Sequence, residues 1–466
     1  MVTEGSHVNP TFELVKQLIK KQVKVTYLLF NQECKEAITL RAIGAHVISS
    51  PEALLTTNHH LSDEQKNVLI HPFSNYVDQP EGYASAEILS HYFMAMLWDD
   101  LLALTKKLNP DVIVYDVVLN GWGKYIGRAL NIPAFASFAP AFSYGPYWKD
   151  PQFQDYLAQY YQKALPPTEK RIWAVDYLHK KLGSIGQDIT VNIPVAFSDS
   201  AYATFVYSYP KFIDYHGESF LGTHLLFTGY VSDNTNTLTK EEEQIINTIK
   251  QRNQNKKLIF VSMGTVSSKP EEFFAMIADA LGNGSKHASS NDNIIVALHP
   301  GYKNINTDEL YDAKQIDGFI KGLGHTNFIV YDYFPLNHLL EDIDIFIGHG
   351  GYNSSMQALQ HYIPIILLPI HGDQLWVGET FKSFGIAKTI PLTINPMPFK
   401  DNFVEWEHFA ASNKRTQFVQ WIQTAVKNIL NNPEQQKEST TKKQYIDSLL
   451  QTNDGYEKAA ELIMQS

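Results

Sequence analysis

Short apolar runs alternate with amphipathic segments in the first half of the chain. Between residues 10 and 21 the apolar positions repeat at helical spacing: Phe12, Val15, Leu18 and Ile19. The apolar run that follows, residues 23–30, predicts a buried strand. The same pattern predicts further helices over 84–108 and 121–130, and further strands over 112–115, 134–137 and 203–207. Strands that alternate with helices in this way are typical of a parallel sheet covered by helices on both faces.

The alternation stops at a polar segment, residues 232–255, and then begins again, which predicts two domains in a chain of this length. We place the boundary near residues 229–233, with an N-terminal domain of residues 1–229 and a C-terminal domain of residues 230–466. The second half predicts strands over 257–263, 294–298, 328–330, 345–347 and 365–368, and a final helix over 443–464 that could pack back on the N-terminal domain. The expected fold class is α/β, with two doubly wound parallel-sheet domains that face each other across a ligand cleft.

One segment interrupts the pattern of the N-terminal domain. Residues 144–186 are rich in aromatic residues, favour helix and contain no clear strand. We interpret them as an insertion, which could either line a ligand site or cap the domain.

Composition narrows the classes of function. The formal net charge is −11 at pH 7, and no run of Lys and Arg exceeds two residues, which argues against nucleic acid or an anionic membrane as a main partner. The only cysteine, Cys34, cannot form an intramolecular disulfide and favours a reducing compartment. No apolar run reaches the roughly 20 residues of a membrane helix, and no signal peptide opens the chain. We therefore expect a cytoplasmic monomer without a membrane span.

A glycine turn at His349, Gly350 and Gly351 carries the strongest chemical signal. It joins an apolar strand to a helix that starts with polar residues, and such a helix start binds anions through free backbone N–H groups and its positive dipole end. The next strand, residues 363–369, leads to Asp373 and Gln374. Polar residues thus follow two neighbouring strands at the edge where open α/β sheets bind ligands. We interpret this region as a nucleotide-sugar site; the alternative is a tightly packed β–turn–α unit without a ligand.

Two further strand ends could extend this site. Ser262, Gly264 and Thr265 form a small-residue turn after the strand over 257–263, and this turn either faces a phosphate or is an ordinary loop. Tyr333 and Phe334 follow the strand over 328–330. An aromatic ring there could stack on a base, an interaction worth about 1–3 kcal/mol, or could pack at a domain seam.

His7 and Asp116 are the candidate catalytic residues. His7 lies at a helix start, where the dipole disfavours imidazolium and keeps the ring neutral at physiological pH. Asp116 ends a strand of the same predicted sheet. A carboxylate that accepts a hydrogen bond from one imidazole nitrogen makes the other nitrogen a base. The alternatives are a surface or capping histidine and a helix-capping aspartate.

The sequence gives little indication of a metal or a redox cofactor. Asp342 and Asp344 resemble a D-x-D metal signature, but they precede a buried strand and are interpreted as structural. No His, Cys, Asp and Glu cluster has metal-site spacing. A dinucleotide-dependent oxidoreductase is disfavoured because no Gly-x-Gly-x-x-Gly with a following acidic residue occurs.

These residues together resemble the motifs of the UDP-glycosyltransferases of glycosyltransferase family 1, over nearly the whole chain. Residues 344–374 resemble the donor-binding signature of that family, and residues 5–10 resemble its N-terminal G-H-x-N-P motif. The resemblance implies the GT-B fold, with two facing Rossmann-like domains. The chain looks most similar to the soluble bacterial enzymes that act on macrolides and other lipophilic small molecules.

The resemblance also implies roles for individual residues. His7 is implied to be the catalytic base and Asp116 its partner. His349, Asn353 and Ser354 would hold the diphosphate, Tyr333 would stack on uracil, and Asp373 with Gln374 would bind the sugar. The full implied donor-binding set is Ser262, Gly264, Thr265, Tyr333, Phe334, His349, Gly351, Asn353, Ser354, Gln357, Asp373 and Gln374.

The chain departs from the family pattern in four places. Gln357 stands where many members have a Glu that binds ribose, so this contact loses its charge assistance. Tyr333 and Leu336 stand where Trp and Gln are usual, and Ser6 stands where a Gly often precedes the histidine. The chain starts at Met1 where the family has a full first strand, so we expect that strand to be short or missing.

The implied function is inverting, metal-independent transfer of a hexose from a UDP-sugar to a hydroxyl group of a lipophilic small molecule. Glucose is the expected sugar, and the UDP-sugar is a co-substrate, so no cofactor is expected. Two alternatives stay open: a UDP-sugar epimerase or hydrolase on the same fold, and a catalytically impaired nucleotide-sugar-binding protein.

Overall fold

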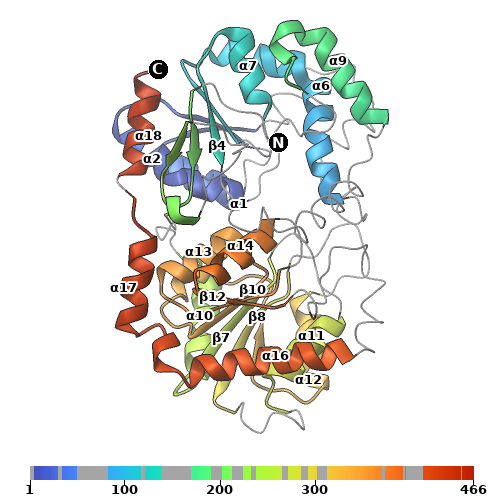
Figure 1. Cartoon of the computed structure of the whole chain (residues 1–466), viewed down its shortest axis with the longest axis vertical. Helices are drawn as coiled ribbons and strands as arrows, with labels where there is room; N and C mark the ends of the chain where they lie inside the picture. The colour runs from blue at the N-terminus through green and yellow to red at the C-terminus, as the bar shows by residue number, and fades with distance from the viewer. Residues whose placement is uncertain are drawn as a thin grey trace. The chain divides into compact units, whose positions relative to one another are not determined.

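The computed structural model divides the chain into two compact units, shown in Figure 1. The N-terminal unit comprises Met1–Val231 and Gln451–Ser466, and the C-terminal unit comprises Ser232–Leu450. The structure describes residues 5–29, 34–49, 82–116, 121–138, 169–189, 202–212, 224–231, 238–264, 271–284, 292–301, 312–369, 373–391, 394, 413–452 and 454–466.

Parallel strands form the two sheets described in the N-terminal unit. One sheet pairs β1 (Thr26–Leu29) with β2 (His46–Ser49). The other has the order β3-β4-β5-β6, and its strands are β3 (Ile113–Asp116), β4 (Ala134–Phe138), β5 (Thr204–Val206) and β6 (Leu225–Phe227). Every pairing is parallel, as the alternation of strands and helices predicts. β1 begins three residues later than the apolar run, which starts at Val23.

Helices of the N-terminal unit bury their apolar stripes against these strands. Leu14 and Leu18 of one helix pack with Phe135 and Phe205 of the four-stranded sheet, whereas Phe12 of the same helix packs with β1. This helix, α2, therefore contributes to the cores of both sheets. The helices that precede the expected insertion are α1 (Gly5–Val8), α2 (Phe12–Lys20), α3 (Lys35–Ile43), α6 (Gly82–Leu108) and α7 (Trp122–Leu130). The 3-10 turn η1 (Asn9–Thr11) joins α1 to α2.

The described part of the expected insertion is helical. It consists of α9 (Glu169–Leu182) and a 3-10 turn, η3 (Gly183–Gly186). Val175 and Leu178 of α9 pack against Trp98 and Leu101 of α6, and this cluster also includes residues of α7. Residues 144–168 of the insertion lie outside the described residues.

The C-terminal unit contains one six-stranded parallel sheet with the order β12-β11-β10-β7-β8-β9. The strands are β7 (Lys257–Ser262), β8 (Ile294–His299), β9 (Phe328–Val330), β10 (Ile345–Gly348), β11 (Ile365–Leu367) and β12 (Ala387–Thr389). The chain passes outward from β7 to β9 and then returns to place β10 on the other side of β7. The point where the strand order reverses, between β7 and β10, is where doubly wound sheets bind ligands.

Helices pack against the central strands of this sheet. The main core joins β7, β8 and β10 to two long helices, α11 and α16. The strands that form it are buried at almost every position, which explains their continuous apolar runs. The helices of this unit are α10 (Lys240–Arg252), α11 (Glu271–Leu281), α12 (Ala313–Gly322), α13 (Tyr352–Gln360), α14 (Asp373–Ser383), α16 (Asn413–Leu430) and α17 (Thr440–Leu449).

The end of the chain differs from expectation. The single helix predicted over 443–464 was wrong, because α17 ends at Leu449 and a separate helix, α18 (Gly455–Met464), follows. Asp454 has a φ of +53°, a left-handed conformation that cannot continue a right-handed helix. The two helices belong to different units, and α18 packs on α2 in the N-terminal unit.

Candidate active site

His7 and Asp116 form a hydrogen-bonded pair in the N-terminal unit. His7 lies on the single-turn helix α1, and Asp116 is the last residue of β3, at the carboxyl edge of the sheet. The Nδ1 atom of His7 lies 3.0 Å from Oδ2 of Asp116, and the two side chains are 15% and 12% exposed. A carboxylate only accepts hydrogen bonds, so Nδ1 carries the proton and Nε2 of a neutral ring has the lone pair. The arrangement is chemically that of an oriented general base.

Two glycine turns and a helix start meet at the strand-order reversal of the C-terminal unit. β7 and β10 are paired with Ser262 opposite Gly348, so the turns that follow both strands start side by side. Gly264 and Gly350 have φ angles of +83° and +88° in these turns, a conformation that L side chains rarely adopt. Gly351 is the N-cap residue of α13, and as a glycine it has no side chain that could accept a hydrogen bond from the first turn of the helix. Its first backbone N–H groups therefore point toward the strand-end turns.

The His349 imidazole lies between two glycines. A Cβ atom at Gly264 would lie 2.7 Å from Cε1 and Nε2 of this ring, and a Cβ atom at Gly351 would lie 2.5 Å from Nε2. On the other side of the ring, Nδ1 lies 3.4 Å from the carbonyl oxygen of Ser262. Because a carbonyl only accepts, Nδ1 is the donor of this contact. The His349 ring can lie here because neither glycine has a Cβ atom, which would overlap the ring.

A second helix start meets the same turn. A Cβ atom at Gly350 would lie 2.7 Å from the carbonyl oxygen of Gln374, so the start of α14 directly contacts the glycine turn. Asp373 is the first residue of α14, and Gln374 is buried. The structure therefore brings His349, Gly351 and the Asp373–Gln374 pair together, as expected for neighbouring strand ends.

The other predicted donor residues are divided between surface and core. Tyr333 is 36% exposed after β9, whereas the ring of Phe334 is buried and packs edge-on against Phe260. Gln357 lies further along α13 and donates a 2.8 Å hydrogen bond from Nε2 to Oδ1 of Asn337. The sequence did not indicate this partnership, because a 3-10 turn brings Asn337 to α13.

The remaining predicted donor residues lie at the start of α13 or outside the described residues. Asn353 and Ser354 occupy the first turn of α13 and are partly exposed. Thr265 lies outside the described residues.

No metal-binding cluster lies in the part of the chain that the structure describes. Groups of three or more His, Cys, Asp or Glu residues that could hold an ion are absent there. Asp344 instead accepts hydrogen bonds from the Lys257 ammonium at 2.8 Å and from the Leu258 backbone at 2.9 Å. Its carboxylate therefore joins the loop before β10 to β7.

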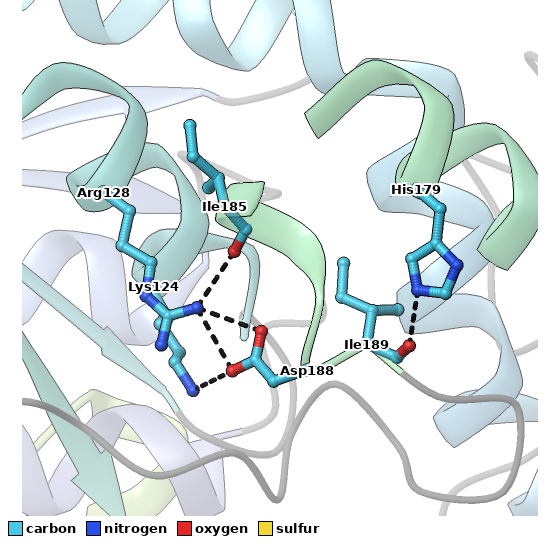
Figure 2. Close-up of polar contacts among 6 residues, drawn as sticks. All are labelled: Lys124, Arg128, His179, Ile185, Asp188 and Ile189. Atoms are coloured by element: carbon cyan, nitrogen blue, oxygen red, sulfur yellow. Dashed lines mark hydrogen bonds and ion pairs between the residues drawn. The ribbon is translucent and has the colours of Figure 1, made fainter. Parts of the chain in front are cut away.

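Charged side chains hold the helical insertion against α7, as Figure 2 shows. Lys124 donates a 2.7 Å hydrogen bond to Asp188, and Arg128 donates to both oxygens of Asp188 at 3.0 and 3.2 Å. Arg128 also donates to the carbonyl oxygen of Ile185. We call Lys124, Arg128 and Asp188 the α7 clasp. Burial opposes ionisation of Asp188, but the bonds from Lys124 and Arg128 hold its pKa below the ordinary value.

α7, which carries two residues of the α7 clasp, packs against β3, the strand that ends at Asp116. α7 follows β3, and Asp116 at the end of β3 is paired with Ser137 of β4. The i, i+4 spacing of Lys124 and Arg128 is visible in the sequence, but nothing local indicates Asp188 as their partner.

Comparisons with known proteins agree with this geometry. A family model described as "UDP-glucoronosyl and UDP-glucosyl transferase" matches residues 220–401. The chain is 26% identical over 383 residues to an uncharacterized UDP-glucosyltransferase, YdhE, of Bacillus subtilis, with 80% of each chain covered. It is 22% identical over 370 residues to the demethyllactenocin mycarosyltransferase of Streptomyces fradiae, covering 78% of this chain and 69% of that protein.

Solved structures show the same fold. The glycotransferase of kitacinnamycin superposes with a TM-score of 0.58 at 16% identity, covering 99% of this chain and 96% of that one. The spinosyn rhamnosyltransferase SpnG superposes with a TM-score of 0.56 at 13% identity, covering 98% and 96%. The expected GT-B fold class is thereby confirmed. No helix among the described residues is long and apolar enough to span a membrane.

Proposed function

We propose that this glycosyltransferase, which is similar to members of the UDP-glycosyltransferase family, transfers glucose from UDP-glucose to a hydroxyl group of a lipophilic small molecule, with inversion at the anomeric carbon. The observation that carries the proposal is the 3.0 Å bond between His7 and Asp116. It provides an oriented base in one unit, and the anion site at α13 provides a place for the nucleoside diphosphate in the other.

His7 acts on the acceptor. Its Nε2 atom removes the proton of the acceptor hydroxyl, and the oxygen then forms a bond to the anomeric carbon of the donor sugar. The bond from that carbon to the UDP oxygen breaks through an oxocarbenium-like transition state. Attack from the face opposite UDP inverts the configuration. Asp116 stabilises the imidazolium that forms on His7.

The C-terminal unit acts on the leaving group. UDP gains negative charge as its bond to the sugar breaks, and fixed donors that face this charge lower the barrier. The start of α13 behind Gly351 and the position of the His349 ring between Gly264 and Gly351 support this role. Tyr333 is exposed enough to stack on the base. Asp373 and Gln374, at the start of α14, are proposed to bind the sugar hydroxyls.

The names of similar proteins bear on the identities of the sugar and the acceptor. One relative is named a UDP-glucosyltransferase, which favours glucose, while another is named a mycarosyltransferase for demethyllactenocin. The structural neighbour named for spinosyn is a rhamnosyltransferase. Together these names favour natural products as acceptors. Metal independence, a monomeric state and a cytoplasmic location, which the single Cys34 favours, remain predictions.

Binding and turnover test the proposal separately. Isothermal titration with UDP, UDP-glucose and UDP-N-acetylglucosamine measures donor preference, and an acceptor screen by mass spectrometry, run with and without EDTA, measures transfer. We expect UDP-glucose to bind most tightly and transfer to persist in EDTA. Sugar release without an acceptor, at a rate equal to transfer, would instead indicate a hydrolase.

His7→Ala tests the proposed base. We expect turnover to fall by a factor of about 10² to 10⁴, with UDP affinity unchanged because the donor site lies in the other unit. His46→Ala is the matched control, since His46 is an exposed histidine of the same unit. Turnover of the His7 variant equal to that of the control would refute the role of His7.

A further inference from the structure

The hydroxyl group of Tyr456 bonds the backbone of the segment that carries His7. Tyr456 lies on α18, at the far end of the chain, and its side chain is 6% exposed. Its hydroxyl donates to the carbonyl oxygen of Pro10 at 3.1 Å and lies 3.4 Å from that of Gly229. A hydroxyl has one proton to donate, so the shorter contact, to Pro10, is the main bond. Pro10 is three residues from His7.

The backbone at the start of α18 lies so close to the end of β6 that no side chain fits at Gly455. A Cβ atom there would lie 2.1 Å from the carbonyl oxygen of Phe227 and 2.5 Å from Cα of Thr228, both at the end of β6. The ring of Tyr456 also stacks on that of Tyr207 with centroids 5.9 Å apart. The hydroxyl group of Tyr456 therefore projects from a rigidly placed ring. Burial raises the pKa of Tyr456 far above its ordinary value, so the hydroxyl keeps its proton.

The segment that carries His7 cannot hold its own position. α1 has four residues, and helices this short are unstable without tertiary contacts. Pro10 has no backbone N–H to donate. Thr11 donates to the carbonyl oxygen of Val8 at 2.7 Å and lies 3.1 Å from the hydroxyl of Tyr27. Buried hydroxyl groups thus bond two backbone carbonyls of this segment.

We propose that Tyr456 is a positioning residue for His7. Through the carbonyl oxygen of Pro10 it fixes the backbone from α1 to α2, and thereby keeps Nδ1 of His7 within hydrogen-bonding distance of Asp116. The effect on turnover rests on the proposed function, whereas the effect on the placement of His7 does not.

Tyr456→Phe tests the proposal with Tyr209→Phe as its matched control. The hydroxyl of Tyr209 is also buried and also donates to a carbonyl oxygen, that of Tyr230 at 3.2 Å, and this bond lies outside the His7 segment. Both variants lose one buried hydrogen bond, so similar losses of thermal stability are expected. We expect kcat to fall about tenfold or more in Tyr456→Phe, because small misplacements of a reacting group are costly. KM for acceptor and affinity for UDP stay unchanged, and Tyr209→Phe retains the wild-type kcat.

A second readout does not require turnover. Histidine labelled at ¹³Cε1 gives one resonance for His7, assigned with the His7→Ala variant. We expect this resonance to shift in Tyr456→Phe and to stay in place in Tyr209→Phe. Thr11→Val, which removes the bond to Val8, should shift it as well and replaces Tyr456→Phe if that variant does not fold. A His7 resonance that stays at its wild-type position in folded Tyr456→Phe would overturn the inference, whether or not the wild type transfers sugar. Absence of transfer by the wild type would overturn the proposed function alone.

Discussion

Gly351→Ala tests whether the His349 ring holds the donor diphosphate. Gly351 has φ −60° and ψ 129°, which alanine adopts without strain, so the substitution acts through its Cβ atom. That atom would lie 2.5 Å from Nε2 of His349, and ordinary contact begins at 3.4 Å. The ring must therefore withdraw by about 0.9 Å.

The displacement is large enough to break a hydrogen bond. Because Nδ1 of His349 donates to Ser262, Nε2 donates to a phosphate oxygen only in the imidazolium form of the ring. A bond of about 2.9 Å from that Nε2–H group to a phosphate oxygen would open past 3.6 Å, where no hydrogen bond remains. Hydrogen bonds to charged groups contribute roughly 1.5–3 kcal/mol. Since 1.4 kcal/mol corresponds to a factor of ten, we expect the Kd for UDP to rise roughly ten- to a hundredfold.

Two further glycines separate steric displacement from backbone strain. Gly264→Ala combines both effects, with a φ of +83° and a Cβ atom 2.7 Å from His349. Gly324→Ala has strain alone, because its φ is +89° and nothing lies within 4 Å. Left-handed backbone costs an L residue about 1–2 kcal/mol. We therefore expect Gly264→Ala to lose stability and UDP affinity, Gly324→Ala to lose stability only, and Gly351→Ala to lose mainly affinity.

Isothermal titration with UDP and urea denaturation measure the two quantities. The interpretation of His349 is refuted if folded Gly351→Ala binds UDP within twofold of the wild type. It is refuted as well if Gly324→Ala weakens UDP binding as much as Gly264→Ala does, because strain would then explain both.

Three other substitutions have defined outcomes. Asp116→Asn should lower kcat by on the order of 10² to 10⁴ while UDP affinity stays constant, because an amide no longer stabilises the imidazolium of His7; initial rates near wild type would contradict this. Asp188→Asn should be less stable than the wild type in urea at pH 7, and the difference should shrink as pH falls through the pKa of Asp188, which lies below its ordinary 3.8; a difference independent of pH would count against the α7 clasp. Burial lowers the pKa of Lys442 to about 8 from 10.5, so the unfolded chain binds more protons between these values and wild-type stability should rise with pH there. In Lys442→Met the free energy of unfolding, measured by urea denaturation at pH 8 and pH 10, should rise less between these two pH values than in the wild type. An equal rise would contradict the lowered pKa of Lys442.

Local patterns predicted most of the secondary structure. The helix at Phe12–Lys20 and the strands at Ile294–His299 and Ile345–Gly348 follow from apolar spacing, because burial of one stripe or of a whole strand leaves a periodic record in the sequence. The last helix was mispredicted because apolar spacing was the only signal used. Its apolar residues suit one continuous helix, and only the contact of Gly455 with the end of β6 shows that the last part packs separately.

The candidate site was partly visible in the sequence. The glycine turn before α13 is visible because strand, turn and helix start follow one another directly in the chain. The pairing of His7 with Asp116 was a hypothesis from the sequence. His7 lies at the start of the first helix, and Asp116 ends a strand of the sheet that this helix was expected to pack on. Asn337 was missed, because its contact with Gln357 joins residues that lack any shared local pattern.

The sequence by itself determined the two α/β halves and the glycine turn before a helix start, and it indicated a candidate base with a candidate carboxylate partner. These depend on periodicity and turn chemistry, which act over a few residues. Only the tertiary structure decided that His7 and Asp116 lie 3.0 Å apart and that Tyr456 bonds the His7 segment. It also decided that the His349 ring lies between Gly264 and Gly351. Such contacts join residues distant in the chain, and their distances are set by how helices and strands pack rather than by any local preference.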